Sequence, residues 1–174
     1  MNKYLLKPIT GTVKEGFILY DENEQEVYKT QMTKFKLFGA SPFEFKNLVT
    51  GKTEEHSVSK VLTVSEKFGN DIAGAMLEMM STKSGFKYDG EKIFNYLHDK
   101  GIRIDSHVNT GKIGMKYDIT FEGKPLATIA NSSPSGKSIL TVDRYYDVEC
   151  EEKDLDLVFL VAFSIARTEQ VFYN

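Results

Sequence analysis

The most constraining feature of the sequence is the apolar segment LDLVFLVAFSIARTEQVFYN, residues 155–174. From Leu155 to Ala166 only Asp156 and Ser164 are polar, so a helix here has almost no wet face. A helix that is apolar on all sides has to be buried on all sides. A membrane span needs about 20 apolar residues, and this run is shorter. The segment is therefore predicted to be a helix threaded through a closed sheet, with Asp154 as its capping residue.

The rest of the chain consists of short apolar runs separated by polar, glycine-containing turns, which is typical of an all-β protein. Three hairpins are predicted: FILY and EVYKTQM around DENEQ, FEFKNLV and SVSKVLTV around TGKTEEH, and IGMKYDITF and PLATIA around EGK. Because successive side chains of a strand point to opposite faces, each strand has one dry face and one wet face. The dry face of IGMKYDITF comprises Met115, Tyr117, Ile119 and Phe121. Such strands suit a sheet wrapped around the apolar helix.

The segment ILTVDRYYDVEC alternates in the same way, but it carries a charge on its dry face. That face comprises Leu140, Val142, Arg144, Tyr146, Val148 and Cys150. An inward charge must be paired or reach the mouth of the barrel. Arg144 is expected to serve a structural role at the C-terminal end of the central helix, and Asp156 is too far along the chain direction to be its partner.

Two segments break the strand rhythm. Residues 89–101 carry apolar side chains at helical spacing and are predicted to form a short surface helix, with Asp89 as N-cap and Gly101 after its end. Residues 72–80, which include AMLEMM, fit a strand or a helix, and the flanking glycines favour a strand.

Composition limits the class of protein and its partners. A chain of 174 residues without a long linker suits a single domain over residues 1–174. A net charge of −3 gives no basic excess, which argues against a nucleic-acid-binding protein. Cys150 is the single cysteine, so the sequence allows neither an internal disulfide nor a cysteine-rich zinc site. With too short an apolar run for a signal peptide in MNKYLLKPIT, a cytoplasmic location is expected.

Two motifs resemble reactive or ligand-binding sites. NSSPSGKS, residues 131–138, ends like a phosphate-binding loop, but the following residues alternate like a strand, whereas such a loop leads into a helix. A hairpin loop is the preferred interpretation, with weak anion binding left to Lys137. HDKGIRIDSH places His98, Asp99, Asp105 and His107 close together in sequence, and these residue types can bind a divalent metal. Their spacing matches no standard site, so the preferred interpretation is that they are polar side chains exposed to solvent. No metal site and no cofactor is expected.

The strongest candidate for a ligand-binding patch is TKFKLF, residues 33–38. It places Lys34 and Lys36 on one face of a strand, with Lys29 nearby in sequence, as in a basic patch for lipid headgroups. The alternative is an ordinary wet strand face on which lysines deter aggregation. No Ser–His–Asp or Cys–His arrangement is evident, and Cys150 on a dry face is expected to be an inert, small apolar side chain.

The overall layout resembles the tubby C-terminal-like superfamily, which includes the phospholipid scramblases, the LURP-one-related proteins and bacterial members of unknown function. The resemblance extends over the whole chain and is clearest in YYDVECEEKDLDLVFLVAFSIARTEQVFYN, where a last strand leads through an acidic loop into the apolar helix. It implies a closed antiparallel barrel of roughly a dozen strands around a buried C-terminal helix. It also implies a link to phosphoinositides or membrane lipids.

These observations together predict a non-catalytic binding or scaffolding module. By resemblance, its ligand is an anionic lipid headgroup or another phosphate-bearing group, met in the cytoplasm or at the membrane surface, and Lys34, Lys36 and Lys137 are the candidate contacts. The first alternative is a protein-interaction or structural module without a small ligand. A nucleotide enzyme that uses residues 136–138 is less favoured, because a strand is predicted after Ser138 where such a loop needs a helix. A lipocalin-like carrier is less favoured, because a plugged barrel leaves little internal cavity.

Overall fold

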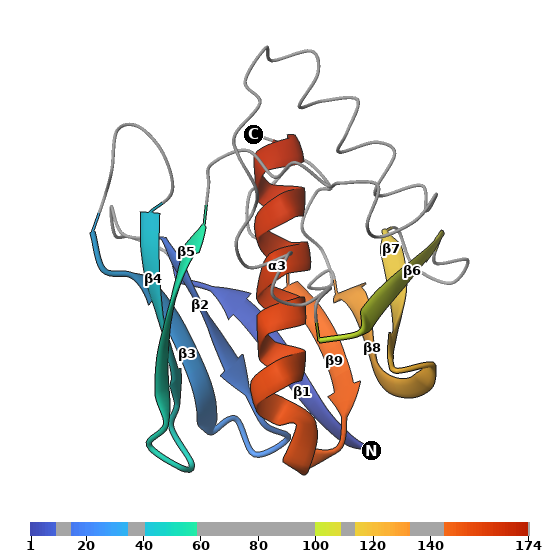
Figure 1. Cartoon of the computed structure of the whole chain (residues 1–174), viewed down its shortest axis with the longest axis horizontal. Coiled ribbons are helices and arrows are strands. Elements are labelled where there is room, and N and C mark those ends of the chain that lie inside the picture. The colour runs from blue at the N-terminus through green and yellow to red at the C-terminus, as the bar shows by residue number, and fades with distance from the viewer. Residues whose placement is uncertain (10–14, 35–40, 59–99, 109–113, 133–144, 174) are drawn as a thin grey trace.

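The computed structural model describes residues 1–9, 15–34, 41–58, 100–108, 114–132 and 145–173 (Figure 1). Its strands are β1 (Asn2–Pro8), β2 (Gly16–Tyr20), β3 (Glu26–Met32), β4 (Ser41–Asn47), β5 (Thr53–Val58), β6 (Ile102–Val108), β7 (Met115–Phe121), β8 (Lys124–Ser132) and β9 (Tyr145–Cys150). A short 3-10 helix, η2 (Glu152–Asp154), leads into the helix α3 (Leu155–Tyr173). The prediction of a mainly β protein with a C-terminal helix is confirmed.

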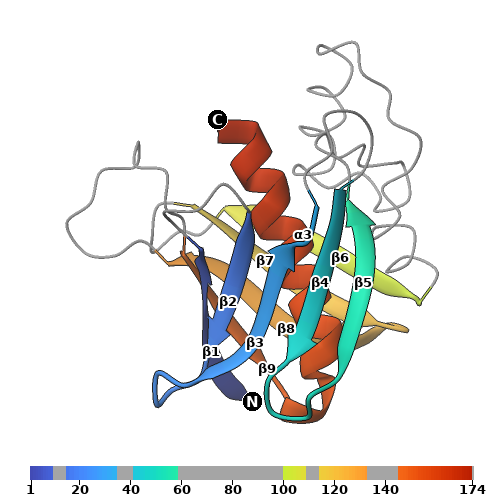
Figure 2. The same ribbon diagram turned by 90° about the vertical axis from the view of Figure 1, so that its left-hand side faces the viewer.

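The described strands form one antiparallel sheet in the order β5-β4-β3-β2-β1-β9-β8-β7-β6. The sheet curves around α3, so that β4 and β5 lie on one side of the helix and β6 and β7 on the other (Figures 1 and 2). Within the described residues β5 and β6 are the two edges and do not pair with each other, so the sheet is not closed there. The fold is thus a nine-stranded curved sheet in the described part, and the closed barrel is not confirmed.

All three predicted hairpins are present, and one has a shorter loop than expected. Thr53–His56, assigned to a loop by the sequence pattern, belong to β5. The chain reverses earlier because Gly51 adopts a φ of +76° and its N–H donates to the Asn47 carbonyl (2.9 Å), while the Asn47 N–H donates to the Lys52 carbonyl. The β7–β8 turn has only two residues, Glu122 and Gly123, both with positive φ, which is the preferred geometry for a two-residue hairpin.

The predicted dry faces form the core. Tyr117 and Ile119 are buried, and Met115 and Phe121 pack against the same cluster. Tyr146, Val148 and Cys150 of β9 are completely buried, which confirms the described part of that face.

Aromatic contacts join α3 to the first half of the sheet. Tyr28 of β3 stacks on Phe159 with ring centres 4.1 Å apart. Phe45 of β4 meets Phe163 edge to face at 5.0 Å, and Phe17 of β2 does so at 5.7 Å. The helix is therefore the centre of the core, as the apolar segment predicts.

The two ends of α3 differ from the simplest expectation. Asp154, the predicted capping residue, is the last residue of η2 and directly precedes α3, and the capping position of η2 is Glu151, which makes no side-chain cap hydrogen bond. The helical turn simply begins one turn earlier than the apolar pattern does. Towards the other end, the buried Arg167 forms an ion pair with Glu15 just before β2, with Nη2 and Oε2 2.8 Å apart. Ser164 satisfies its buried hydroxyl by donating to the Leu160 carbonyl (2.7 Å).

Several sequence predictions lie outside the described residues. They are the candidate contacts Lys36 and Lys137, the inward Arg144, His98 and Asp99, the segment 72–80 and most of the predicted surface helix 89–101. These remain predictions.

Candidate functional site

Lys34 is the predicted binding residue that lies in the described part of the chain, and it is exposed in a bend after β3. Lys29, noted as its neighbour in the sequence, lies on the outer face of β3, because Tyr28 and Thr30 on either side of it point into the core. Its partner across the β3–β4 pair is Lys46. The structure thus joins Lys29 to a lysine that sequence analysis did not select, although FEFKNLV has the right alternation to place Lys46 on the wet face.

The two lysines belong to a longer row across the outer face. The register pairs Lys7 with Ile18, Ile18 with Lys29, and Lys29 with Lys46. We call these four residues the lysine row. Neither Lys29 nor Lys46 forms an ion pair with a carboxylate in the described part of the chain. The row is therefore basic and uncompensated over β3 and β4.

The surroundings of the lysine row set its size. At one end, the Lys7 ammonium lies 4.8 Å from the ring centre of Tyr20 and 5.7 Å from that of Tyr145, within cation–π range. In the next row across β4 and β5, Glu44 lies opposite Glu55. A basic row beside an acidic pair suits a compact anionic group better than a broad anionic surface.

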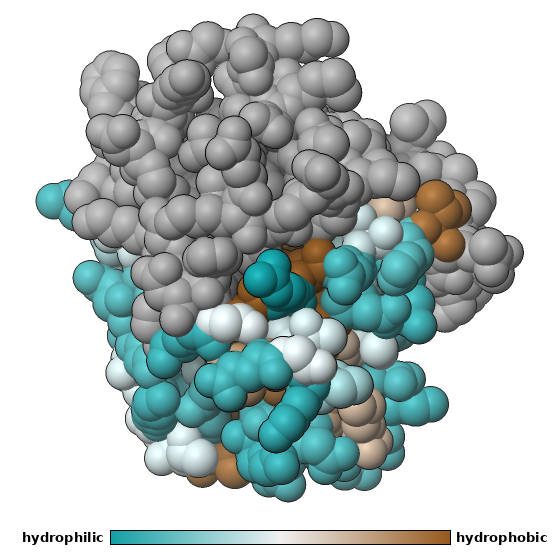
Figure 3. Space-filling model, turned by 45° about the vertical axis from the view of Figure 1, so that its right-hand side comes forward, coloured by the Kyte–Doolittle hydropathy of each residue, from teal (hydrophilic) through white to brown (hydrophobic). Residues whose placement is uncertain are grey.

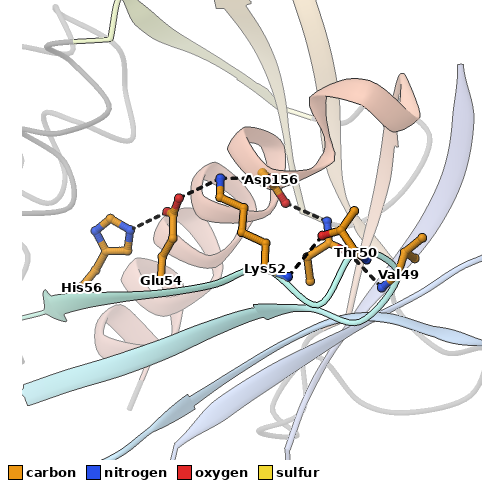
Figure 4. A network of polar contacts seen from close by, with 7 residues as sticks. Val49, Thr50, Lys52, Glu54, His56 and Asp156 are labelled. Atoms are coloured by element: carbon orange, nitrogen blue, oxygen red, sulfur yellow. Dashed lines mark hydrogen bonds and ion pairs between the residues drawn. The ribbon is translucent and has the colours of Figure 1, made fainter.

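A second polar cluster lies where α3 begins (Figure 4). The Asn47 amide nitrogen donates to Asp156 Oδ1 (2.7 Å), and Asn47 Oδ1 accepts from the N–H groups of Val49 and Thr50 (both 3.0 Å). Lys52 Nζ lies 3.2 Å from Asp156 Oδ2 and 2.8 Å from Glu54 Oε1. The cluster ties the β4–β5 turn to the first turn of the helix.

The charges in this cluster support one another. Hydrogen bonds from Lys52 and then from His56 outweigh burial and hold the pKa of Glu54 below its usual value. Burial disfavours the charged form of Asp156, but the hydrogen bonds from Asn47 and Lys52 outweigh it, so its pKa is also lowered. The hydrogen bond with Glu54, followed by that with Asp156, raises the pKa of Lys52. We therefore assign the cluster a structural role, which is to hold the β4–β5 turn against the first turn of α3.

Of the other polar candidates, His107 lies in the described part of the chain, in β6. His107 Nε2 lies 3.0 Å from Asp118 Oδ2, and Asp118 also lies 3.5 Å from Lys116. Within the described residues no group of three or more metal-ligand side chains is placed to hold an ion. Cys150 is buried, and burial raises the pKa of its thiol to about 12, as expected for an unreactive side chain.

The NSSPSGKS motif begins in a strand. Asn131 and Ser132 end β8, and β8 pairs antiparallel with β9, the next described element. A phosphate-binding loop of the nucleotide-enzyme type joins a strand to a helix. The described elements before and after this motif, β8 and β9, are both strands.

Much of the described surface in Figure 3 is hydrophilic, with apolar side chains in small separate areas. Among the described helices, none has the length and apolar character that crossing a membrane requires. Comparison of the chain with protein-family models, with curated proteins and with solved structures gives no match. The class that fold and site define is thus a curved β-sheet around a core helix, with an uncompensated basic row on its outer face.

Proposed function

We propose that the protein is a non-catalytic binding module whose ligand carries a phosphate group, bound between Lys29 and Lys46. The observation that carries the proposal is the direct opposition of these two lysines across β3 and β4 without a carboxylate partner. Like charges directly opposite each other destabilise a sheet by up to about 1 kcal/mol. A bound anion removes that repulsion, which favours the complex over the free protein.

The neighbours of the lysine pair support a compact ligand. Ile18 provides apolar surface between Lys7 and Lys29, where a short carbon skeleton attached to the phosphate can lie. Lysine binds phosphate as a point charge, without the planar geometry that arginine imposes. The shared chemistry is a phosphate ester, and its source is either a lipid headgroup at a cytoplasmic membrane surface or a soluble molecule.

We also propose that the fold is the closed, tubby-like barrel expected from the sequence. Its support is the curved sheet, the buried helix that follows the last strand, and the sequence layout. The lysine row does not depend on this proposal, since β1 to β4 alone define it.

Calorimetry and vesicle sedimentation test the binding. The variant K29Q/K46Q removes the opposed pair, and K116Q/K124Q removes two lysines from β7 and β8 as a matched control. If each lysine contributes about 1 kcal/mol near an anionic group, the first variant binds about thirtyfold more weakly. Inositol phosphates and glycerol phosphate test soluble sources, and vesicles with anionic phospholipid test the lipid source.

Equal losses in both double variants would show that only net charge matters, which would remove the site from β3 and β4. If none of these probes binds the native protein, the alternative of a protein-interaction module without a small ligand is favoured.

A further inference from the structure

An open cleft of about 1060 Å³ lies at the end of the molecule where α3 begins. Its walls come from the start of β1, the β2–β3 turn, the β4–β5 turn and the β9–α3 junction. Val27 and Leu155, both buried, contribute apolar side chains to its lining. The volume is at the upper end of the range for small-molecule pockets, and the open shape suits a segment of chain.

The walls are held in place by side-chain hydrogen bonds. Asn47 joins the β4–β5 turn to Asp156 of α3, as described above. In the opposite turn, Asp21 Oδ1 accepts from the N–H groups of Asn23 (2.9 Å) and Gln25 (2.8 Å). A cleft with fixed walls loses little conformational entropy when a partner binds.

The cleft is acidic, in contrast to the lysine row. Five carboxylates line it, from Asp21, Glu22, Glu151, Glu152 and Asp156, against three cations, the ammonium groups of Lys3, Lys153 and the Met1 N-terminus. The N-terminal ammonium lies 3.2 Å from Glu151 Oε1. Glu22 and Glu152 are exposed and form no ion pair within the described residues, so their charges are available to a partner. Beside them Val49 is 63% exposed, on a turn whose backbone Asn47 fixes.

We infer that this cleft docks an extended basic segment of a partner protein, with one apolar side chain against Val49 and cationic side chains near Glu22 and Glu152. Charge complementarity selects this occupant: an anionic ligand would meet a net excess of two carboxylates, five less three cations. A metal ion is not the occupant, because no three ligand side chains in the described residues are placed to hold one. An interface of this kind combines an apolar centre with a charged rim.

The inference is independent of the proposed phosphate site, because the cleft and the lysine row share no residue. Fluorescence anisotropy tests it with a short labelled peptide in which a central leucine is flanked by lysines and arginines. A second peptide has serine in place of the leucine. The variant E22Q/E152Q removes the two free carboxylates, and E44Q/E55Q removes two exposed carboxylates from the outer face as a matched control.

We expect the leucine peptide to bind the native protein at low salt. The variant E22Q/E152Q should bind this peptide more weakly, with a loss of affinity of up to about fivefold. V49S should weaken the leucine peptide and leave the serine peptide unchanged, while K29Q/K46Q should bind both as the native protein does. No binding of the leucine peptide, equal binding of both peptides, or an equal loss in E44Q/E55Q would each overturn the inference.

Discussion

At the scale of single residues, the Asn47 side chain makes three hydrogen bonds in the polar cluster. It is 5% exposed and bonds to two backbone N–H groups and to Asp156. Asn47→Ala leaves these groups without their partner, and we expect a loss of about 1–3 kcal/mol in the free energy of unfolding. Urea denaturation measures it. Asn23→Ala, at an exposed turn position, should cost far less, and equal costs would contradict the assigned role.

Asp156 and Glu54 make stability depend on acid pH. Both have a folded-state pKa below the usual value, so each contributes stability above its unfolded pKa, and that contribution is lost as pH falls through the folded pKa. Asp156→Asn should therefore lower the free energy of unfolding at neutral pH. The difference from the native protein should shrink below about pH 4, near the unfolded pKa of a carboxyl group.

Thermal melts from neutral to acid pH measure this effect, with Glu22→Gln as the control at an exposed carboxyl without an ion pair. A deficit of Asp156→Asn that stays constant with pH would mean that the pairing with Lys52 does not stabilise the fold.

Side-chain direction is predictable from the sequence, but pairing is not. Alternation alone places Lys46 on the wet face and Cys150 on the dry face, and the structure agrees. The opposition of Lys29 and Lys46 depends on strand register, which the burial of one face of each strand specifies. The contact from Asn47 to Asp156 joins residues 109 positions apart, and no local pattern carries it.

At the scale of elements, Gly16 determines how closely β2 approaches β3. A Cβ atom there would lie 2.3 Å from the Thr30 carbonyl oxygen and 2.9 Å from Ile9 Cδ1. Gly16→Ala must push the two strands apart, and we expect a loss of about 2 kcal/mol or more, as for other overpacked sites. Chemical denaturation measures it.

Gly51→Ala is the matched control for this steric effect. The space around Gly51 is open, but its φ is +76°, so alanine there costs about 1 kcal/mol through backbone strain alone. A larger loss at Gly51 than at Gly16 would contradict the close approach of the two strands.

The helix α3 is fixed to the sheet through Phe163, whose ring meets those of Phe17, Phe43 and Phe45. Phe163→Ala should cost about 3–5 kcal/mol, because the cavity borders several strands that cannot all collapse into it. Leu157→Ala, at a partly buried position of the same helix, should cost less. Equal losses measured by urea denaturation would show that the ring cluster is not the centre of the core.

Elements with strong patterns were predictable, and the limits of the weaker ones were not. The apolar run from Leu155 to Ala166 identifies the helix because its lack of a polar face leaves one solution. The helix α3 spans Leu155–Tyr173, close to the predicted segment 155–174, whereas the short helix η2 before it has no apolar pattern that predicts it. The β4–β5 turn was placed too late because the polar TEEH resembles a loop, although Glu54 and His56 bond to each other along β5.

At the scale of the whole molecule, Cys150 reports on global opening. It is fully buried in β9, which lies next to the central strand β1 of the sheet, and burial raises the pKa of its thiol to about 12. Labelling by a maleimide at neutral pH should therefore be very slow in the native protein and fast in urea. Mass spectrometry measures the rate, and destabilisation by Phe163→Ala should raise it. Fast labelling of the native protein would contradict the burial of β9.

The general architecture followed from composition and periodicity, whereas closure did not. One-sided strands and one fully apolar helix leave few arrangements other than a sheet around the helix. Whether the sheet closes depends on what happens between β5 and β6, and the described strands leave these as separate edges. Closure is a property of strand number and stagger together, which no single segment encodes.

The strand order has a consequence for how the protein is made. Strand β1 pairs with β2 and with β9, so the two halves of the sheet join only when β9 emerges from the ribosome, and α3 emerges after it. Until then α3 is not available to cover the apolar faces of the hairpins that the structure describes. Because the core helix is synthesised last, the growing chain is prone to aggregation throughout synthesis. A chaperone that binds nascent chains is therefore expected to raise the yield of folded protein.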